Sequence, residues 1–324
     1  MTVVEQSRRL RAAVVGCGSF GQNHLRVLSQ SPTVDLVAAV DTNPDRAGAA
    51  ARQYPGCQPL PDWRALAGLA DVAVVATPTT THAEIGSGLL AAGLDLLVEK
   101  PIAATVAEAG QLIAAAESHG RILQIGHLER FNSAVLSLER VLTVPLFFEI
   151  HRLSLFAPRS LDVDVVLDLM IHDIDIVLAL VGKLPEEVRA AGVRILSPKV
   201  DIANVRLAFP GGCIANLTAS RVSTEKVRKL RLFQPHQYIS IDYSRQDGMA
   251  FTVDGKQQIG FEPLGLEKKE PLAAQWESFL EAVATRRPPR VTGRQAATSL
   301  QVCTDILAKI EEHGAIVAQT LAGV

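Results

Sequence analysis

The alternation of short apolar runs with amphipathic stretches over residues 10–123 limits what this chain can fold into. Runs such as VDLVAAV and VAVV have the length of buried strands, and the Ala-rich stretches between them have the spacing of crossover helices. A parallel sheet covered by helices on both faces is the fold that this order builds, so we predict a doubly wound α/β domain. The expected strands are 11–15, 34–40, 72–76, 95–98 and 121–124, and the expected helices are 21–30, 45–53, 81–92 and 106–119.

After about residue 124 the pattern changes to that of a second, mixed domain. A long apolar helix is expected over about 162–181, stopped by Gly182, and strand follows strand from 188 to about 259. This predicts an α+β domain with a largely antiparallel open sheet. We expect domains at 1–124 and 125–324, helices near 272–286 and 294–312, and a last helix able to pack back on the first domain.

Composition and charge exclude several classes of protein. The 324 residues are 48% hydrophobic and 20% charged, which is a globular composition, and a formal charge of -2 provides no field to attract nucleic acid or an anionic membrane. The most apolar long segment, 163–181, carries charged residues that argue against a membrane span. Four cysteines lie far apart without a CxxC pair, so we expect no zinc site, no disulfide framework and a reducing cytoplasm. They are Cys17, Cys57, Cys213 and Cys303.

A glycine cluster joins the first expected strand to the first expected helix. Gly16, Gly18 and Gly21 have the G-x-G-x-x-G spacing, with Ser19 and Phe20 between the last two. Glycine is needed for the tight turn, for close approach of the backbone to a pyrophosphate, and for close packing of the helix against the strand. The phosphates would lie on the helix N-terminus. The pattern predicts a dinucleotide site, and the alternative for the glycines alone is a structural turn.

An acidic residue ends the second expected strand. Asp41 follows Gly21 by 20 residues, where a carboxylate can accept hydrogen bonds from the adenine ribose hydroxyls. Its charge would repel the 2′-phosphate of NADP. No arginine that could bind this phosphate follows at once, because four residues separate Asp41 from Arg46, so NAD is expected rather than NADP. Asp41 can also be a turn residue, and the two roles can coexist.

Two further segments carry polar residues that the fold itself would not require. Lys100, in VEKP, follows an apolar strand at the sheet edge where ligands bind in this architecture, although a solvated lysine is the alternative. Asp168 and His172 lie four residues apart in an apolar helix and would share one face. Burying them is costly unless they are paired or used. A structural pair is one alternative, and a metal site is another, but no second histidine cluster completes it.

With these motifs the chain resembles the glucose-fructose oxidoreductase, inositol dehydrogenase and MocA (Gfo/Idh/MocA) family of NAD(P)-dependent sugar oxidoreductases. The resemblance spans nearly the whole chain and rests on GCGSFG, ATPTTTHAE, VEKP and the D-x-x-x-H of the long helix. It implies that Lys100, Asp168 and His172 form the catalytic group and that the Lys100–Pro101 bond is cis. The implied cofactor residues are Gly16, Gly18, Ser19, Phe20, Gly21, Asp41, Thr77, Pro78, His82, Glu99 and Lys100.

The implied reaction is hydride transfer from a secondary alcohol carbon of a sugar to carbon 4 of the nicotinamide. His172 is the expected general base, and Asp168 would orient its ring and stabilise the imidazolium. Lys100 would stabilise the developing alkoxide, or, with a lowered pKa, would itself be the base. The sequence leaves these two roles open.

A finer likeness narrows the substrate. GHLERFNSAV and PRSLDVDVVLDLMIHDIDI resemble bacterial UDP-sugar 3-dehydrogenases, above all those for UDP-N-acetylglucosamine. Ser133 stands where a proline is expected and Asp164 where a glycine is common, so a different sugar stays open. Arg130, Arg152 and Arg159 are candidates for contacts with the diphosphate, and the alternative for each is a solvated surface charge. The residues expected to border the substrate are Lys100, Gly126, His127, Arg130, Phe131, Asn132, Arg152, Arg159, Asp168 and His172.

Other functions stay open beside this one. A UDP-sugar-uronate 3-dehydrogenase would need an extra cation, an inositol or free-sugar dehydrogenase would need no diphosphate site, and a redox-neutral NAD-dependent glycoside hydrolase would release no net NADH. A nucleotide-sensing or scaffold protein is disfavoured because Lys100, Asp168 and His172 are all present. The open sheet predicts a homo-oligomer, dimer or tetramer, without nucleic-acid or membrane partners.

Overall fold

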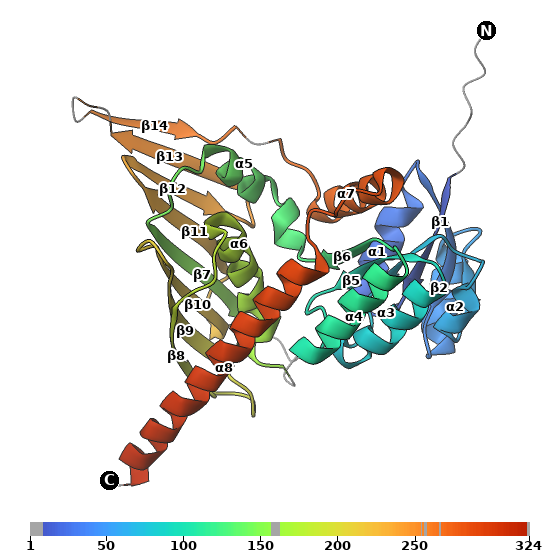
Figure 1. The fold of residues 1–324 in the computed structure, drawn as a ribbon, viewed down its shortest axis with the longest axis horizontal. Coiled ribbons are helices and arrows are strands. Elements are labelled where there is room, and N and C mark those ends of the chain that lie inside the picture. The colour runs from blue at the N-terminus through green and yellow to red at the C-terminus, as the bar shows by residue number, and fades with distance from the viewer. Residues whose placement is uncertain (1–8, 157–162, 254, 256–257, 266, 323–324) are drawn as a thin grey trace. The chain divides into compact units, whose positions relative to one another are not determined.

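The computed structural model describes residues 9–156, 163–253, 255, 258–265 and 267–322, and within them the chain forms two compact units (Figure 1). The first unit runs to Gly126 and includes Leu272–Ala297, and the second comprises His127–Pro271 and the residues from Thr298 onward. No helix of the described part is long and apolar enough to cross a membrane.

The first unit is a six-stranded parallel sheet in the order β3-β2-β1-β4-β5-β6, which confirms the predicted doubly wound fold. The strand order reverses between β1 and β4, and a doubly wound sheet binds its ligand outside the carboxyl ends of the strands at this point. The strands are β1 (Leu10–Val15), β2 (Val34–Val40), β3 (Gln58–Leu60), β4 (Val72–Val75), β5 (Asp95–Glu99) and β6 (Leu123–Gly126).

Local signals place the crossover helices of this unit. Asn43 caps α2 through the backbone N–H groups of Asp45 and Arg46, and Thr105 forms a capping box with Glu108 at the start of α4. Strands β4 and β5 are buried along their whole length, so their apolar runs do not alternate. The helices are α1 (Ser19–Ser29), α2 (Pro44–Gln53), α3 (His82–Ala91) and α4 (Val106–Ser118), with 3-10 turns η1 (Trp63–Leu66) and η2 (Thr79–Thr81).

A late segment of the chain completes the first unit, which corrects the predicted domain boundary. Helix α7 (Pro271–Thr285) buries Trp276 and Phe279 here, and Gln124 donates from Nε2 to the carbonyl of Gln275 at 3.1 Å. The backbone N–H of Ile125 donates a hydrogen bond to the carbonyl oxygen of Val291. These pairings join residues far apart in the sequence, so no local pattern indicates them.

The second unit is an eight-stranded sheet in the order β14-β13-β12-β11-β7-β10-β9-β8. All pairs are antiparallel except β7 with β10, so the predicted, largely antiparallel sheet is confirmed. The strands are β7 (Phe147–Leu155), β8 (Glu187–Val193), β9 (Ile202–Ala208), β10 (Ile214–Ser223), β11 (Val227–Gln234), β12 (Gln237–Asp242), β13 (Asp247–Val253) and β14 (Ile259–Pro263).

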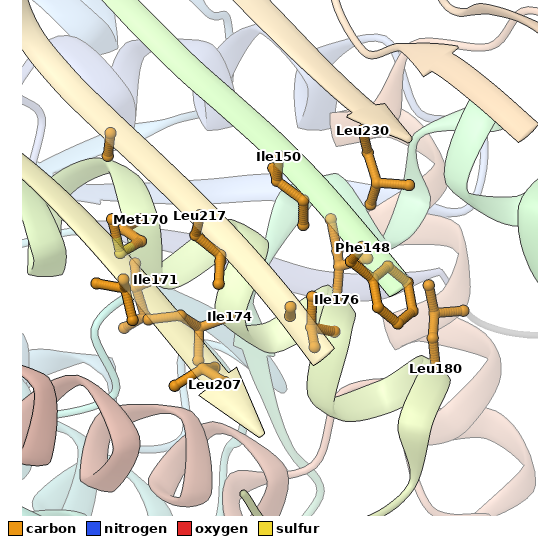
Figure 2. Packing of buried hydrophobic residues seen from close by; sticks show 14 of the residues in the cluster. Phe148, Ile150, Met170, Ile171, Ile174, Ile176, Leu180, Leu207, Leu217 and Leu230 are labelled. Carbon is orange, nitrogen blue, oxygen red and sulfur yellow. The ribbon is translucent and has the colours of Figure 1, made fainter. Parts of the chain in front are cut away.

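The core of this unit lies on one face of the sheet. Side chains alternate between buried and exposed along strands such as β9, and the buried ones face the helices. Figure 2 shows Phe148 and Ile150 of β7 among side chains of α6 (Ile171–Val181). Helix α5 (Ser133–Val141) and helix α8 (Gly293–Ala322) add further side chains to this core.

The two long helices differ from their predicted form. The single helix expected over 162–181 is a π-helical turn, Val166–Met170, followed by α6, and residues 157–162 lie outside the described part. Gly182 ends α6 with a φ of 69°, as predicted. Helix α8 extends ten residues past the expected end at about 312, and the division between the two units falls within it, at Thr298.

Candidate active site

The first unit contains a cavity of about 730 Å³ at the carboxyl ends of β1, β2 and β4, which is the size of a small-molecule site. The predicted residues Gly16, Gly18, Asp41, Thr77 and Pro78 line it. The structure therefore brings the glycine loop, the acidic residue and the loop after β4 together around one space.

The glycine loop is shaped as a nucleotide site requires. Gly16 has a φ of +95°, and a Cβ there would lie 2.6 Å from the carbonyl oxygen of Ala76. A Cβ on Gly21 would lie 1.8 Å from the oxygen of Gly16, whereas a Cβ on Gly18 would meet nothing within 4 Å. Gly18 thus faces open space, where a pyrophosphate can approach the backbone. No side chain caps α1, and its first turn carries no acidic residue, so its N-terminus suits an anion.

Asp41 is held at the end of β2 by two backbone donors. Its Oδ2 accepts from the N–H of Cys17 at 2.9 Å, and its Oδ1 accepts from the N–H of Asn43 at 2.8 Å. Each carboxylate oxygen keeps accepting capacity for a ribose hydroxyl. The turn role and the ribose role proposed for this residue are therefore compatible, and the cavity fits NAD.

Sequence reasoning missed several residues that line the same cavity, among them Arg46, Trp63 and Arg64. Trp63 packs closely against Gly88, where a Cβ would lie 2.2 Å from the indole. The guanidinium of Arg64 lies 4.3 Å from the centroid of the Trp63 ring. The available signal was a tryptophan in the polar stretch PDWRAL of a chain with 2 tryptophans.

His82 is not among the residues that line the cavity, and its predicted cofactor contact stays a prediction. It is 1% exposed, with Nδ1 2.9 Å from the oxygen of Pro101 and Nε2 2.9 Å from that of Thr77. Burial lowers the pKa of His82 more than these carbonyls and the charge of Glu99 raise it, so the neutral ring donates to one carbonyl at a time. His82 therefore holds the loop after β4 near the segment after β5.

Lys100 follows β5 directly, is half-buried, and precedes Pro101 through a cis peptide bond, as expected. Glu99 is 7% exposed, and its Oε1 lies 2.9 Å from Nε2 of His24. Glu99 does not line the cavity. The structure thus gives Glu99 a buried protein partner, and its predicted cofactor contact stays a prediction.

The predicted catalytic residues of the second unit lie at the junction of the π-helical turn with α6. Asp168 is within the turn and His172 is the second residue of α6. The ring of His172 lies edge-on to that of His127, with centroids 6.3 Å apart, so the structure brings these two predicted site residues together. His127 is 1% exposed.

Asp175 supports this pair from one turn further along α6. Its Oδ1 accepts from the hydroxyl of Ser299 at 3.1 Å. Its Oδ2 lies 3.8 Å from Nδ1 of His127 and 3.6 Å from Nη1 of Arg130. Arg130 is 7% exposed and also lies 3.8 Å from Glu139, so its charge faces protein carboxylates.

Arg152 is held by protein carboxylates, and its predicted diphosphate contact stays a prediction. The side chain is 2% exposed and makes two bonds to Asp173, at 2.7 and 2.8 Å, and one of 3.0 Å to Glu129. Burial lowers the pKa of Arg152, but these two carboxylates outweigh that effect and raise it. The alternation of β7 explains this position, because Arg152 shares the inward face with Phe148 and Ile150.

The structure shows protein contacts for the other predicted substrate residues of this unit, and their substrate contacts stay predictions. Asn132 caps α5 and donates to Glu129 and to the carbonyl of Tyr243, each at 3.0 Å, and Phe131 is 3% exposed. The unexpected Ser133 donates its hydroxyl to the carbonyl of Glu267 at 2.7 Å, a bond that a proline could not make. Arg159 lies outside the described residues.

Comparison with known proteins places this geometry in a family. The profile of the oxidoreductase family with an NAD-binding Rossmann fold matches residues 10–127, and the Gfo/Idh/MocA C-terminal domain profile matches residues 149–238. The chain belongs to the Gfo/Idh/MocA oxidoreductase family. It is an NAD-dependent oxidoreductase, as its sequence predicts.

Individual relatives differ in how much of the chain they match. UDP-N-acetylglucosamine 3-dehydrogenase from Acidithiobacillus ferrooxidans is 37% identical over 306 residues, covering 90% of this chain and 96% of its own. Inositol 2-dehydrogenase from Acidothermus cellulolyticus is 32% identical over 197 residues, which is 58% of each chain. Similarity to the first relative thus continues through both units.

Solved structures confirm the fold of this Gfo/Idh/MocA protein. UDP-N-acetylglucosamine 3-dehydrogenase GnnA from Acidithiobacillus ferrooxidans has a TM-score of 0.88 at 33% identity, covering 94% of this chain and 99% of that one. Scyllo-inositol dehydrogenase from Lactobacillus casei, solved with NAD(H) and scyllo-inositol, has a TM-score of 0.80 at 15% identity over 94% of this chain and 98% of its own. The second likeness bears on the fold alone.

Proposed function

We propose that this protein oxidises the 3-hydroxyl of a UDP-linked sugar, UDP-N-acetylglucosamine in the first place, to the 3-keto sugar. The observation that carries the proposal is the similarity to UDP-N-acetylglucosamine 3-dehydrogenase across 90% of the chain, including the second unit. Similarity to the inositol 2-dehydrogenase covers 58% of the chain, so it supports the cofactor more than the substrate.

The glycine loop and Asp41 would hold NAD, which when bound would supply a hydride acceptor at its nicotinamide ring. Gly18 leaves space for the pyrophosphate, and the N-terminus of α1 favours its charge. The carboxylate of Asp41 accepts from the adenine ribose and disfavours a 2′-phosphate. Trp63 and Arg64 form the wall of the cavity beyond Asp41.

Lys100, Asp168 and His172 carry the chemistry. His172 takes the proton from the substrate hydroxyl, and Asp168 orients its ring and stabilises the resulting cation. The ammonium group of Lys100 stabilises the negative charge that develops on the same oxygen. His127 limits the rotation of the His172 ring by its edge-on contact. Arg130, Arg152 and Arg159 are the candidates for contacts with the diphosphate.

The test is a substrate panel followed by NADH absorbance and sugar mass. Wells hold NAD with UDP-N-acetylglucosamine, its uronate, myo-inositol or glucose, and an amine donor with a sugar aminotransferase draws the uphill oxidation forward. We expect NADH and a keto sugar, or its amino product, in the UDP-N-acetylglucosamine well alone. No signal with either UDP-sugar would contradict the proposal and direct the search to free sugars or to the redox-neutral hydrolase.

We propose further that the protein is a homo-oligomer that packs through the outer face of the second sheet. An aromatic row crosses that face, with neighbouring ring centroids 4.8 to 6.5 Å apart, and its Phe233 and Phe261 are 37% and 67% exposed. A second copy offers the same row, which suits a two-fold contact. The row comprises Phe147, Phe233, Tyr238, Phe251 and Phe261.

Sedimentation tests this assembly. Phe261→Lys is expected to lower the sedimenting mass, whereas Lys183→Ala, at an exposed site on another part of the unit, leaves it unchanged. A protein that sediments as a monomer before any substitution would contradict the oligomer. The four cysteines are free and buried, which supports a reducing compartment such as the cytoplasm.

A further inference from the structure

Three buried side chains of the first unit form one hydrogen-bonded series that ends at Glu99. The indole N–H of Trp276 donates to Nδ1 of His24 at 2.9 Å, and Nε2 of His24 lies 2.9 Å from Oε1 of Glu99. Trp276, His24 and Glu99 are 2%, 0% and 7% exposed, and none of them lines the nucleotide cavity. The series joins α7 and α1 to the end of β5.

The indole N–H of Trp276 determines which nitrogen of the His24 ring carries the hydrogen. An indole nitrogen can only donate, so Nδ1 of His24 must accept the bond from Trp276. The neutral ring then carries its hydrogen on Nε2, where it donates to the carboxylate of Glu99. Trp276 thus sets the tautomer of His24 that Glu99 needs.

Glu99 is confined on its other side by the neighbouring strand. Gly126 of β6 pairs with Glu99, and a Cβ on Gly126 would lie 2.7 Å from Oε1 and 2.8 Å from Oε2. The carboxylate therefore rests against a backbone that has no side chain. With His24 on one side and Gly126 on the other, its position is closely defined.

Lys100 follows Glu99 and precedes Pro101, and hydrogen bonds to histidine rings hold both of these residues. Lys100 follows the last residue of β5, so a fixed Glu99 sets the position at which the backbone of Lys100 leaves the sheet. On the far side, the carbonyl oxygen of Pro101 lies 2.9 Å from Nδ1 of His82. A shift of Glu99 would move the start of the Lys100 side chain.

We propose that Trp276, His24 and Glu99 form a positioning relay that aims the Lys100 ammonium group at the reacting oxygen. His24 and Trp276 are positioning residues, since they act through Glu99 and do not line the nucleotide cavity. The proposal rests on the catalytic role proposed above for Lys100. It goes beyond that role because it assigns a task to His24 and Trp276, which belong neither to the glycine motif nor to the VEKP segment.

A pair of substitutions at His24 separates the two ends of the relay. In His24→Gln the side-chain amide NH₂ lies near the original Nε2 and keeps the donor to Glu99, whereas His24→Asn keeps an oxygen near Nδ1 and loses that donor. A misplacement of about 1 Å at a catalytic group costs on the order of 100-fold in rate. We therefore expect kcat to fall by about that factor in His24→Asn and to stay near the original value in His24→Gln, with KM and the Kd for NAD little changed in both.

A structural role alone predicts a different pattern. Both variants would then lose melting temperature together, and kcat would follow that loss. Equal kcat values in His24→Asn and His24→Gln, or a larger loss in His24→Gln, would overturn the relay.

Two readouts do not depend on turnover, so they separate failure of the relay from failure of the proposed function. In protein labelled with ¹⁵N-histidine, His24 should show a hydrogen on Nε2 and a bare Nδ1 at neutral pH. In competitive acylation read by mass spectrometry, the rate at Lys100 should change in His24→Asn and not in His24→Gln, with Lys183 as the internal reference. A hydrogen on Nδ1, or unchanged Lys100 reactivity in His24→Asn, would overturn the relay even in an enzyme with the expected activity.

Discussion

Asp41 accepts a hydrogen bond at 2.9 Å from the backbone N–H of Cys17, so the end of β2 is tied to the glycine loop that follows β1. The bond places a negative charge on the wall of the nucleotide cavity and holds it there. We propose that this charge also faces the adenine ribose and so decides between the two nicotinamide cofactors.

Replacing this carboxylate should change cofactor preference. Asp41→Ser loses a charged hydrogen-bond acceptor, which is worth about 1.5–3 kcal/mol, so the Kd for NADH should rise by roughly 10- to 100-fold. The Kd for NADPH should change less or fall, because the repulsion is removed. Fluorescence titration with both cofactors measures this, with Asp45→Asn as a control in the neighbouring helix. Unchanged discrimination in Asp41→Ser would contradict the ribose contact.

The glycine loop provides a matched pair of alanine substitutions. A Cβ at position 21 would lie 1.8 Å from the oxygen of Gly16, so Gly21→Ala should lower the free energy of unfolding by about 1–3 kcal/mol or more. A Cβ at position 18 meets no protein atom within 4 Å, so Gly18→Ala should keep its stability and lose NAD affinity. Thermal melts with and without NAD distinguish the two. Full NAD affinity in Gly18→Ala would place the pyrophosphate elsewhere.

The buried ion pair of the second unit should be costly to break. Arg152→Met removes the buried cation from Asp173 and Glu129 and leaves them the partly exposed Arg228, 3.7 Å from Glu129. Breaking a buried ion pair typically costs about 3–5 kcal/mol. Arg231→Met removes an arginine that pairs with Glu149 on the outer face, at 40% exposure, and should cost about 0–1 kcal/mol. Urea unfolding of the two variants makes the comparison, and equal losses would contradict the buried role of Arg152.

The same substitution should make stability depend on pH in a defined direction. Burial raises the pKa of Asp173, and Arg152 opposes that effect, so Arg152→Met should raise it further in the folded state. A raised folded-state pKa contributes stability below the unfolded value that is lost as pH rises through the folded one. The deficit of Arg152→Met should therefore shrink on acidification. A deficit that is constant with pH would show that Asp173 does not take up the proton.

Asp201 should show the opposite dependence. Burial raises its pKa, but bonds from the backbone N–H groups of Ile195 and Leu196, from Ser197 and from Arg221 lower it more, to well below the usual value. Its stabilisation is present above the unfolded pKa of about 3.9 and is lost as pH falls below that value.

A conservative substitution tests the carboxylate of Asp201. Asp201→Asn should be less stable than the parent at neutral pH and should approach it as pH falls below about 4, in thermal melts across that range. Asp247→Asn, at a carboxylate that is 49% exposed, serves as the control. A gap between Asp201→Asn and the parent that does not narrow in acid would contradict the assignment.

Sequence predicted those features that depend on local pattern. The strands of the doubly wound unit, the glycine loop and the stop at Gly182 follow from short-range rules on burial, turn geometry and capping. The Asp41 position followed from spacing alone. Each of these signals is complete within a few residues, so no tertiary information is needed to read it.

Other features depend on contacts that a linear pattern does not contain. Trp276 joins the first unit because it reaches His24, which lies 252 positions earlier. The π-helical turn around Asp168 leaves the apolar pattern of the long helix unchanged. The burial of Arg152 was foreseeable, because the alternation of β7 places it on the inward face, but its charge suggested a ligand instead.

The fate of the hydrogen on carbon 3 of the sugar tests the central claim most directly. UDP-N-acetylglucosamine deuterated at carbon 3 is incubated with the enzyme, NAD, an amine donor and the sugar aminotransferase that removes the keto sugar. The reduced cofactor is then examined by mass spectrometry. We expect the NADH to carry one deuterium and the initial rate to fall relative to the unlabelled sugar. NADH without deuterium, or no NADH at all while wild-type protein still binds NAD, would contradict oxidation at that carbon.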